Sequence, residues 1–298
     1  MFAKKLLVFA ILVSVIVTPS IAAEGFPALS SSVDKRLQDH LEHKLQQIGL
    51  EQAAKRGDLT VALTDITNPA HPRVATINAE KMMYAASLPK IAILLGAFVC
   101  IEQGEITLNE QTRETLVRMI RYSSNTAATE MLNRVGKEKL AKILQSPRFA
   151  FYDYENNGGL WVGKDYGKAS AWKRDPLANL SHGANAFQVA RFYYMLETGQ
   201  LFSSELNKEM KAILGNPGIN HKFVKGLNTS RPGSQIYRKS GTWRAWHSDS
   251  AIVERDGRRY IAVALAHSEN GSQWLQDLIV ALDDLVFETA PANVALLD

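Results

Sequence analysis

Cysteine is almost absent from this chain of 298 residues, since Cys100 is the only one. A single cysteine excludes an intramolecular disulfide framework and any cysteine-rich zinc or iron–sulfur site. An excess of charge of one sign is also missing, because 34 basic residues face 30 acidic ones and the formal net charge is +4. Nucleic-acid-binding proteins usually concentrate a larger positive excess in one patch, so we expect no nucleic-acid partner.

Long apolar runs are rare as well, and the longest lies near the N-terminus. Residues 6–17 are apolar apart from Ser14 and follow a Lys-Lys pair. This run is shorter than the roughly 20 residues that a helix needs to cross a bilayer. A basic segment, an apolar segment and the small residues Ala22-Ala23 form the order of a secretory signal peptide. We therefore expect residues 1–23 to be a cleaved signal peptide, and the mature chain to be periplasmic or secreted without a stable membrane span.

The rest of the chain changes between helical and strand patterns. Apolar residues recur at helical spacing over residues 32–57, 88–103, 108–136, 137–145, 187–198, 204–214 and 273–287. Alternating patterns predict strands over residues 59–65, 74–79, 236–242, 249–254 and 258–267. Ser32 and Gly57 stand where the first helix would begin and end. Residues 146–185 show no period and predict a long loop.

Strands thus come from both ends of the mature chain, and its middle is helical. The simplest packing joins them in one antiparallel sheet flanked by helices, an α/β (α+β) fold, with a helical lobe beside it. Within a single catalytic domain, residues 24–298, we assign residues of about 24–84 and 225–298 to the sheet lobe. The helical lobe then covers residues of about 85–224. A small-molecule pocket is expected between the two lobes.

Three short motifs carry candidate chemistry. Ser87-Leu-Pro-Lys90 places a serine and a lysine on one face at the start of a predicted helix. A lysine whose pKa is lowered by burial and by another cation can take the proton of a serine hydroxyl. Ser123-Ser-Asn125 follows in the helical region, and Lys239-Ser-Gly-Thr lies on a predicted strand. The glycine in that strand indicates a close backbone approach by a ligand, or a bulge.

Ser-x-x-Lys alone is also compatible with an ordinary capping serine and a solvated lysine, and Ser-x-Asn occurs a second time at Ser268. Ser-x-x-Lys occurs again at Ser32 and Ser170. Only Ser87, Ser123 and Lys239 follow the order Ser-x-x-Lys, Ser-x-Asn, Lys-Ser-Gly on a helix start, a loop and a strand. In this order, and in the segment Ser-Ser-Asn-Thr-Ala-Ala, the chain resembles the penicillin-recognising serine hydrolases, most closely the class A β-lactamases.

The resemblance implies a β-lactamase/transpeptidase-like fold with an antiparallel five-stranded sheet. It implies that Ser87 attacks the substrate carbonyl, that Lys90 helps to activate it, and that Ser123 passes a proton to the leaving nitrogen. The backbone N–H groups of Ser87 and Thr242 would form the oxyanion hole. No metal or cofactor is implied. The residues that would bind substrate are Asn125, Lys239, Ser240, Gly241 and Thr242.

The chain departs from the class A pattern in three ways, of which one is a shorter stretch between Ser87 and Ser123. Ser124 stands where class A enzymes have aspartate, and the loop motif Glu-x-x-Leu-Asn, whose glutamate activates the deacylating water, is absent. Asp175, in Asp-Pro-Leu-Ala-Asn, is a candidate substitute, and the alternative is a turn-forming Asp-Pro. Trp243, Arg244 and Trp246 either line the pocket or are strand and turn residues.

The first functional hypothesis is an exported class A-like β-lactamase that hydrolyses the β-lactam amide through an acyl-enzyme on Ser87. The missing glutamate favours an alternative, a D-alanyl-D-alanine carboxypeptidase or penicillin-binding protein that acts on the peptidoglycan stem peptide. A third possibility is a sensor that is acylated without turnover. In each case the partner is a small molecule, and we expect a monomer.

Overall fold

The structure, a computed structural model, describes residues 25–289, so the expected signal peptide lies outside the described residues. Its main sheet consists of β1 (Leu59–Asp65), β2 (Arg73–Ile77), β8 (Gln235–Trp243), β9 (Trp246–Arg255) and β10 (Arg258–His267). The strand order is β2-β1-β10-β9-β8, and all neighbours are antiparallel. The early hairpin and the late strands therefore join in one sheet, which confirms the predicted arrangement.

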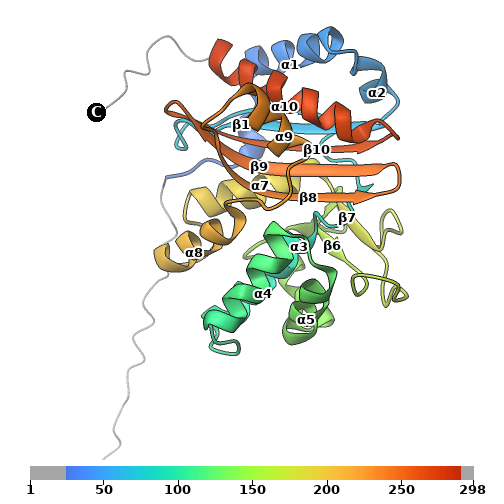
Figure 1. Ribbon diagram of the computed structural model, residues 1–298, viewed down its shortest axis with the longest axis vertical. Helices are drawn as coiled ribbons and strands as arrows, with labels where there is room; N and C mark the ends of the chain where they lie inside the picture. The colour runs from blue at the N-terminus through green and yellow to red at the C-terminus, as the bar shows by residue number, and fades with distance from the viewer. Residues whose placement is uncertain (1–24, 290–298) are drawn as a thin grey trace, which may run out of the picture.

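Helices cover both faces of this sheet (Figure 1). On one face lie α1 (Lys35–Gln47) and α10 (Gly271–Glu288), with α9 (Phe223–Ser230) against α10. On the other face α7 (Ala186–Glu197) packs against β1, β9 and β10. Alternate residues of the strands enter the two apolar cores, because successive side chains of a strand point to opposite faces.

The helical part is built around α3 (Lys90–Glu102), in which every residue from Lys90 to Cys100 is buried. A helix that is apolar on all sides belongs inside a protein, and four helices surround this one. Lys90 is therefore carried by one of the most enclosed elements of the molecule. The surrounding helices are α4 (Glu110–Arg121), α5 (Asn125–Val135), α6 (Lys137–Gln145) and α8 (Ser204–Leu214).

The first predicted helix is in fact two helices, and it begins three residues later than expected. The side chain of Asp34, not Ser32, caps α1 by accepting a hydrogen bond from the Leu37 amide (2.8 Å). Gly49 then adopts a φ of +73°, which ends the helical path, and α2 (Glu51–Lys55) follows. The long helix predicted over residues 108–136 is also divided, by the turn between α4 and α5. Helix α9 has no counterpart in the prediction.

Residues 146–185, predicted as one long loop, contain short strands, and one of these pairs with a short strand earlier in the chain. β3 (Met83–Tyr84) pairs with β7 (His182–Ala184), and β7 pairs with β6 (Trp161–Val162). A separate pair consists of β4 (Tyr152–Asp153) and β5 (Gly158–Gly159). Both ends of the segment 163–181, called here the site loop, are therefore held beside the turn that follows β3.

Candidate active site

Ser87 lies in the tight turn between β3 and α3. Its predecessor Ala86 has a φ of +50°, a left-handed conformation that costs a non-glycine residue about 1–3 kcal/mol. Contacts of Ala85 hold this turn, since its amide donates to His182 O (3.0 Å) and its carbonyl accepts from Ser248 Oγ (2.8 Å). A strained turn that neighbouring elements hold in place is typical of a functional site.

Gly241 explains the glycine inside strand β8. A Cβ at this position would collide with Ala85 O and lie 2.6 Å from Ser87 N. The group that approaches Gly241 is therefore the protein's own serine turn and not the expected ligand. This close approach places β8 directly beside the backbone amide of Ser87, one residue before Thr242.

Lys90 is buried at the start of α3 and donates its hydrogen bonds to Ser123, in the turn between α4 and α5, and to Asn125, the first residue of α5. Its Nζ lies 2.6 Å from Ser123 O, 2.9 Å from Asn125 Oδ1 and 3.4 Å from Ser123 Oγ. Burial lowers the pKa of the Lys90 ammonium to about 7. Near neutral pH a large fraction of this lysine is uncharged and able to accept a proton.

Ser123 connects two lysines. Lys239 Nζ donates to Ser123 Oγ (3.0 Å) and to Ser240 O (2.6 Å). Burial, with the nearby charge of Lys90, holds the pKa of Lys239 well below its usual value, while Asp249 opposes this shift. The φ of Ser123 is +57°, a left-handed conformation. In this conformation both its backbone carbonyl and its hydroxyl face Lys90 Nζ. The first, second and third motifs are thus joined by hydrogen bonds.

Ser124 accounts for one departure from the class A pattern. Its Oγ accepts a hydrogen bond from the Ala127 amide (3.2 Å), so it is the N-cap of α5. Serine and aspartate are both favoured at this position of a helix. The substitution therefore keeps the cap that orients Asn125, the next residue.

Lys222 lies beneath the third motif, and nothing in its sequence context points to it. Its Nζ donates to Gly241 O (2.6 Å) and Thr242 Oγ1 (2.7 Å), and burial lowers its pKa to about 7. Next to it Arg238 and Asp249 form a buried bidentate ion pair with two distances of 2.7 Å. Both features support the backbone of β8 from below.

A sequence model of the beta-lactamase enzyme family matches residues 40–113 and 111–289, most of the chain. The chain belongs to the beta-lactamase enzyme family. No curated protein matches the sequence significantly.

Solved structures agree with the fold of this β-lactamase family member. The structure of PBP-A is 17% identical with a TM-score of 0.64, covering 87% of this chain and 98% of its own. A β-lactamase from Chitinophaga pinensis is 15% identical, with a TM-score of 0.64 and coverage of 84% and 100%. One from Xanthomonas campestris is 16% identical, with a TM-score of 0.66 and coverage of 84% and 98%. The predicted β-lactamase-like fold is confirmed.

The site of this β-lactamase family member opens into a hollow of about 800 Å³ between the Ser87 turn, the site loop and the β8–β9 hairpin. Trp243 and Trp246 line this hollow, so for these two residues the interpretation as pocket residues is correct. Trp246 also stacks on His267, with ring centroids 3.9 Å apart. Arg244 instead occupies the hairpin turn, where its φ is +51° and its guanidinium lies 5.7 Å from the Trp243 ring.

Asp175 does not belong to the lining of this hollow. Its carboxylate is buried and accepts hydrogen bonds from Tyr152 Oη (2.7 Å) and from the amides of Leu177 (3.1 Å) and Leu180 (2.9 Å). The structure thus favours the turn-forming interpretation over the deacylation role. The side chain that covers Lys90 from the site loop is Tyr166, whose ring centroid lies 4.5 Å from Lys90 Nζ.

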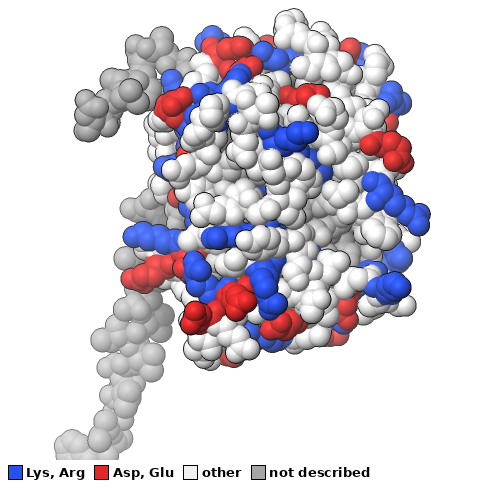
Figure 2. Space-filling model, in the orientation of Figure 1, with Lys and Arg blue, Asp and Glu red and all other residues white. Residues whose placement is uncertain are grey.

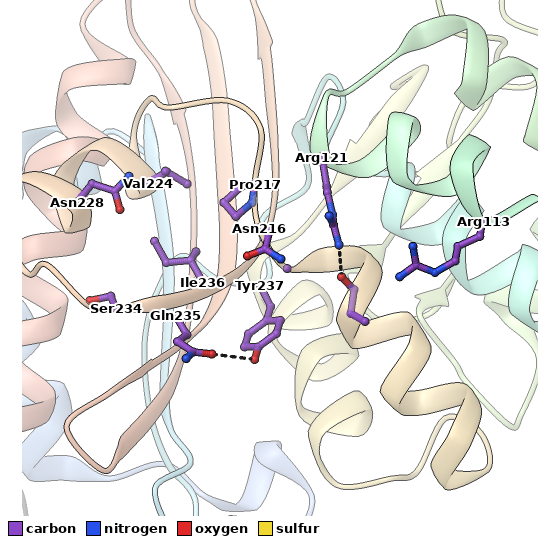
Figure 3. Close-up of a pocket in the computed structure, with 12 residues that line it drawn as sticks. Arg113, Arg121, Asn216, Pro217, Val224, Asn228, Ser234, Gln235, Ile236 and Tyr237 are labelled. Atoms are coloured by element: carbon purple, nitrogen blue, oxygen red, sulfur yellow. Dashed lines mark hydrogen bonds between the residues drawn. The ribbon is translucent and has the colours of Figure 1, made fainter. Parts of the chain in front are cut away.

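A second hollow, of about 570 Å³, lies between α4, α8 and the outer edge of β8 (Figure 3). Two arginines reach it, and both have partners inside the protein. Arg113 pairs with Glu209 (2.5 Å), and Arg121 donates to Ala212 O (2.6 Å), a bond visible in Figure 3. We assign no chemistry to this hollow, because its charged groups are engaged in structural contacts.

The surface provides no strong alternative. Figure 2 shows acidic and basic side chains interspersed over the face in view. Within residues 25–289, no three His, Cys, Asp or Glu side chains are arranged to hold a metal ion. No helix in the same part of the chain is both long and apolar enough to cross a membrane.

Proposed function

We propose that this protein is an exported serine hydrolase that is acylated on Ser87 and acts as a class A-like β-lactamase. The observation that supports this proposal is the chain of hydrogen bonds Lys90–Ser123–Lys239 beside the Ser87 turn. It supplies a lysine of lowered pKa next to a serine, a second hydroxyl for proton transfer, and a cation for a substrate carboxylate.

In the proposed reaction, Lys90 takes the proton of Ser87, whose Oγ attacks the carbonyl carbon of the β-lactam amide. The backbone amides of Ser87 and Thr242 stabilise the oxyanion, a contribution of about 3–4 kcal/mol for one donor. Ser123 gives its proton to the leaving nitrogen and takes up the proton held by Lys90, and the C–N bond breaks. Lys239 and Ser240 hold the substrate carboxylate, and Asn125 binds the amide of its side chain. Water then hydrolyses the acyl-enzyme.

A D-alanyl-D-alanine carboxypeptidase or penicillin-binding protein is the second candidate. The observation in its favour is that no aspartate or glutamate is among the described residues that line the hollow. Tyr166 lies against Lys90 instead, and its own hydroxyl is 3.4 Å from Ala86 O. A pocket without a carboxylate acylates by the same route but activates the deacylating water poorly.

Intact-protein mass spectrometry with benzylpenicillin, followed over time, tests the proposal. A transient adduct with many-fold consumption of the penicillin supports a β-lactamase, and a long-lived stoichiometric adduct supports the second candidate. Ser87→Ala should abolish the adduct without unfolding the protein, while Ser170→Ala, which alters the other Ser-x-x-Lys of the loop region, should keep it. An adduct that persists in Ser87→Ala would contradict the assignment.

A further inference from the structure

Two lysines of the site loop reach the hollow that contains Ser87. Lys164 and Lys168 line it together with Gly167, and no acidic side chain of the described chain lines it with them. The cation assigned to the substrate carboxylate is a different one, Lys239, which is buried on β8. The hollow therefore carries more positive charge than one carboxylate requires.

Nearby acidic residues do not neutralise these lysines. Asp165 lies between them in sequence, but its carboxylate pairs with Lys137 of α6 (2.9 Å). Asp175, at the far end of the loop, is held by its own turn. Lys164 Nζ donates to Gly167 O (3.1 Å), and neither lysine forms an ion pair within residues 25–289.

The walls next to the lysines are aromatic. Tyr84 and Trp246 make an edge-to-face contact with centroids 6.1 Å apart, and Trp243 is 56% exposed at the rim. Lys164 is half-buried and Lys168 is exposed, so both ammonium groups can be reached from the hollow. A ligand whose apolar part packs against these rings can bring an anionic group to the two lysines.

We propose that the acyl side of this site selects substrates with a second carboxylate, in addition to the one held by Lys239 and Ser240. Lys164 and Lys168 bind this group through charge-assisted hydrogen bonds, and the aromatic walls accept the apolar part of the acyl chain. The inference rests on the proposed acylation of Ser87, and it specifies the substrate class of that reaction.

Benzylpenicillin and carbenicillin form a suitable pair of probes, because they differ by one carboxylate on the acyl side. The readout is the ratio of their acylation rate constants on Ser87, carbenicillin over benzylpenicillin, at low ionic strength. We expect Lys164→Gln/Lys168→Gln to lower this ratio by about 3- to 10-fold, the range expected for two partly exposed ion pairs. Added salt should lower the ratio of the unaltered protein in the same direction.

The matched control is Lys173→Gln, which removes an exposed lysine of the same loop that does not line the hollow. It should leave the ratio unchanged, and so separates local binding from the net charge of the loop. Thermal unfolding of each variant checks that the protein remains folded. If the double variant does not fold, the two single variants, Lys164→Gln and Lys168→Gln, are measured in its place. A ratio that is the same in the lysine variants and the unaltered protein overturns the inference. If neither penicillin forms an adduct on Ser87, the proposed function itself fails, and the inference with it.

Discussion

Ser123 is the residue at which two buried lysines compete for one hydroxyl. Lys90 and Lys239 cannot both be fully charged at low cost so close together in a dry site, and both have lowered pKa values. Lys90 also donates to Ser123 O and Asn125 Oδ1, so it keeps two acceptors even when the Ser123 hydroxyl accepts from Lys239. A small change of environment is then enough to move a proton along this chain of groups.

The pH dependence of acylation follows from Lys90. In the proposed reaction the neutral amine of Lys90 takes the proton of Ser87, and its pKa is about 7, so the acylation rate should rise with pH around a midpoint of about 7. The buried His182 and His247 and the half-buried His221 do not provide this midpoint, since burial lowers the pKa of His182 to about 3 and those of His221 and His247 to about 4. Stopped-flow measurement of acylation by a chromogenic cephalosporin from pH 5.5 to 9 would show it.

His267 provides the control for this profile, since it stacks on Trp246 at the edge of the hollow. His267→Gln should retain the midpoint. A rate that does not change between pH 5.5 and 9, in a protein that is still acylated on Ser87, would show that Lys90 is not the base.

At the scale of elements, a buried carboxylate holds the turn at the far end of the site loop. Asp175 accepts hydrogen bonds from one side chain and from several amides of its own turn, and Tyr152 connects it to β4. Burial and the hydrogen bond to Asp175 raise the pKa of Tyr152. The loop that carries Lys164, Tyr166 and Lys168 is thus fixed at its far end by contacts that lie outside the hollow.

We expect Asp175→Asn to lower the free energy of unfolding by about 1.5–3 kcal/mol, since it weakens hydrogen bonds to a charged group. Tyr152→Phe should cost about 1 kcal/mol, because it removes only one of these bonds. Urea denaturation measures both, and mass spectrometry of the Ser87 adduct should show a lifetime like that of the unaltered protein.

The control is Asp153→Asn, since Asp153 accepts amide hydrogen bonds in an exposed turn and its loss should cost little. The prediction is wrong if Asp175→Asn traps the adduct at unchanged stability. That result would mean that the carboxylate acts on the deacylating water.

At the scale of the whole molecule, the ends of the described chain close the fold. β1 from the N-terminal part lies beside β10 from the C-terminal part, and α1 packs against α10 (Figure 1). The segments between them supply the helical part and the site loop.

Export itself is a prediction for the full chain. When the full sequence is expressed in a Gram-negative host, the protein should be recovered from the periplasm with Ala23 or Glu24 as its first residue. The basic and apolar segments of residues 1–17 are the physical signal. Intact mass and N-terminal sequencing check this outcome, and Leu12→Arg should retain the uncleaved protein in the cytoplasm. Cleavage that is unaffected by Leu12→Arg would argue against a signal peptide.

The sequence by itself determined the strands of the main sheet, most of the helical segments and the residues of the three motifs. These features depend on local periodicity, on turn chemistry and on short motifs, all of which can be read from neighbouring residues. Gly241 is an example, because a glycine inside a predicted strand already indicated that another group comes close to the backbone there.

Only the tertiary structure decided which groups surround those motifs. Tyr166 covers Lys90, Lys222 supports β8 and Asp175 turns away into its own loop, although none of these positions is next to its partner in sequence. Burial, which lowers the pKa values of the lysines, is a property of all the packed elements together. The charge and the walls of the substrate pocket are therefore set by long-range contacts, and no local pattern records them.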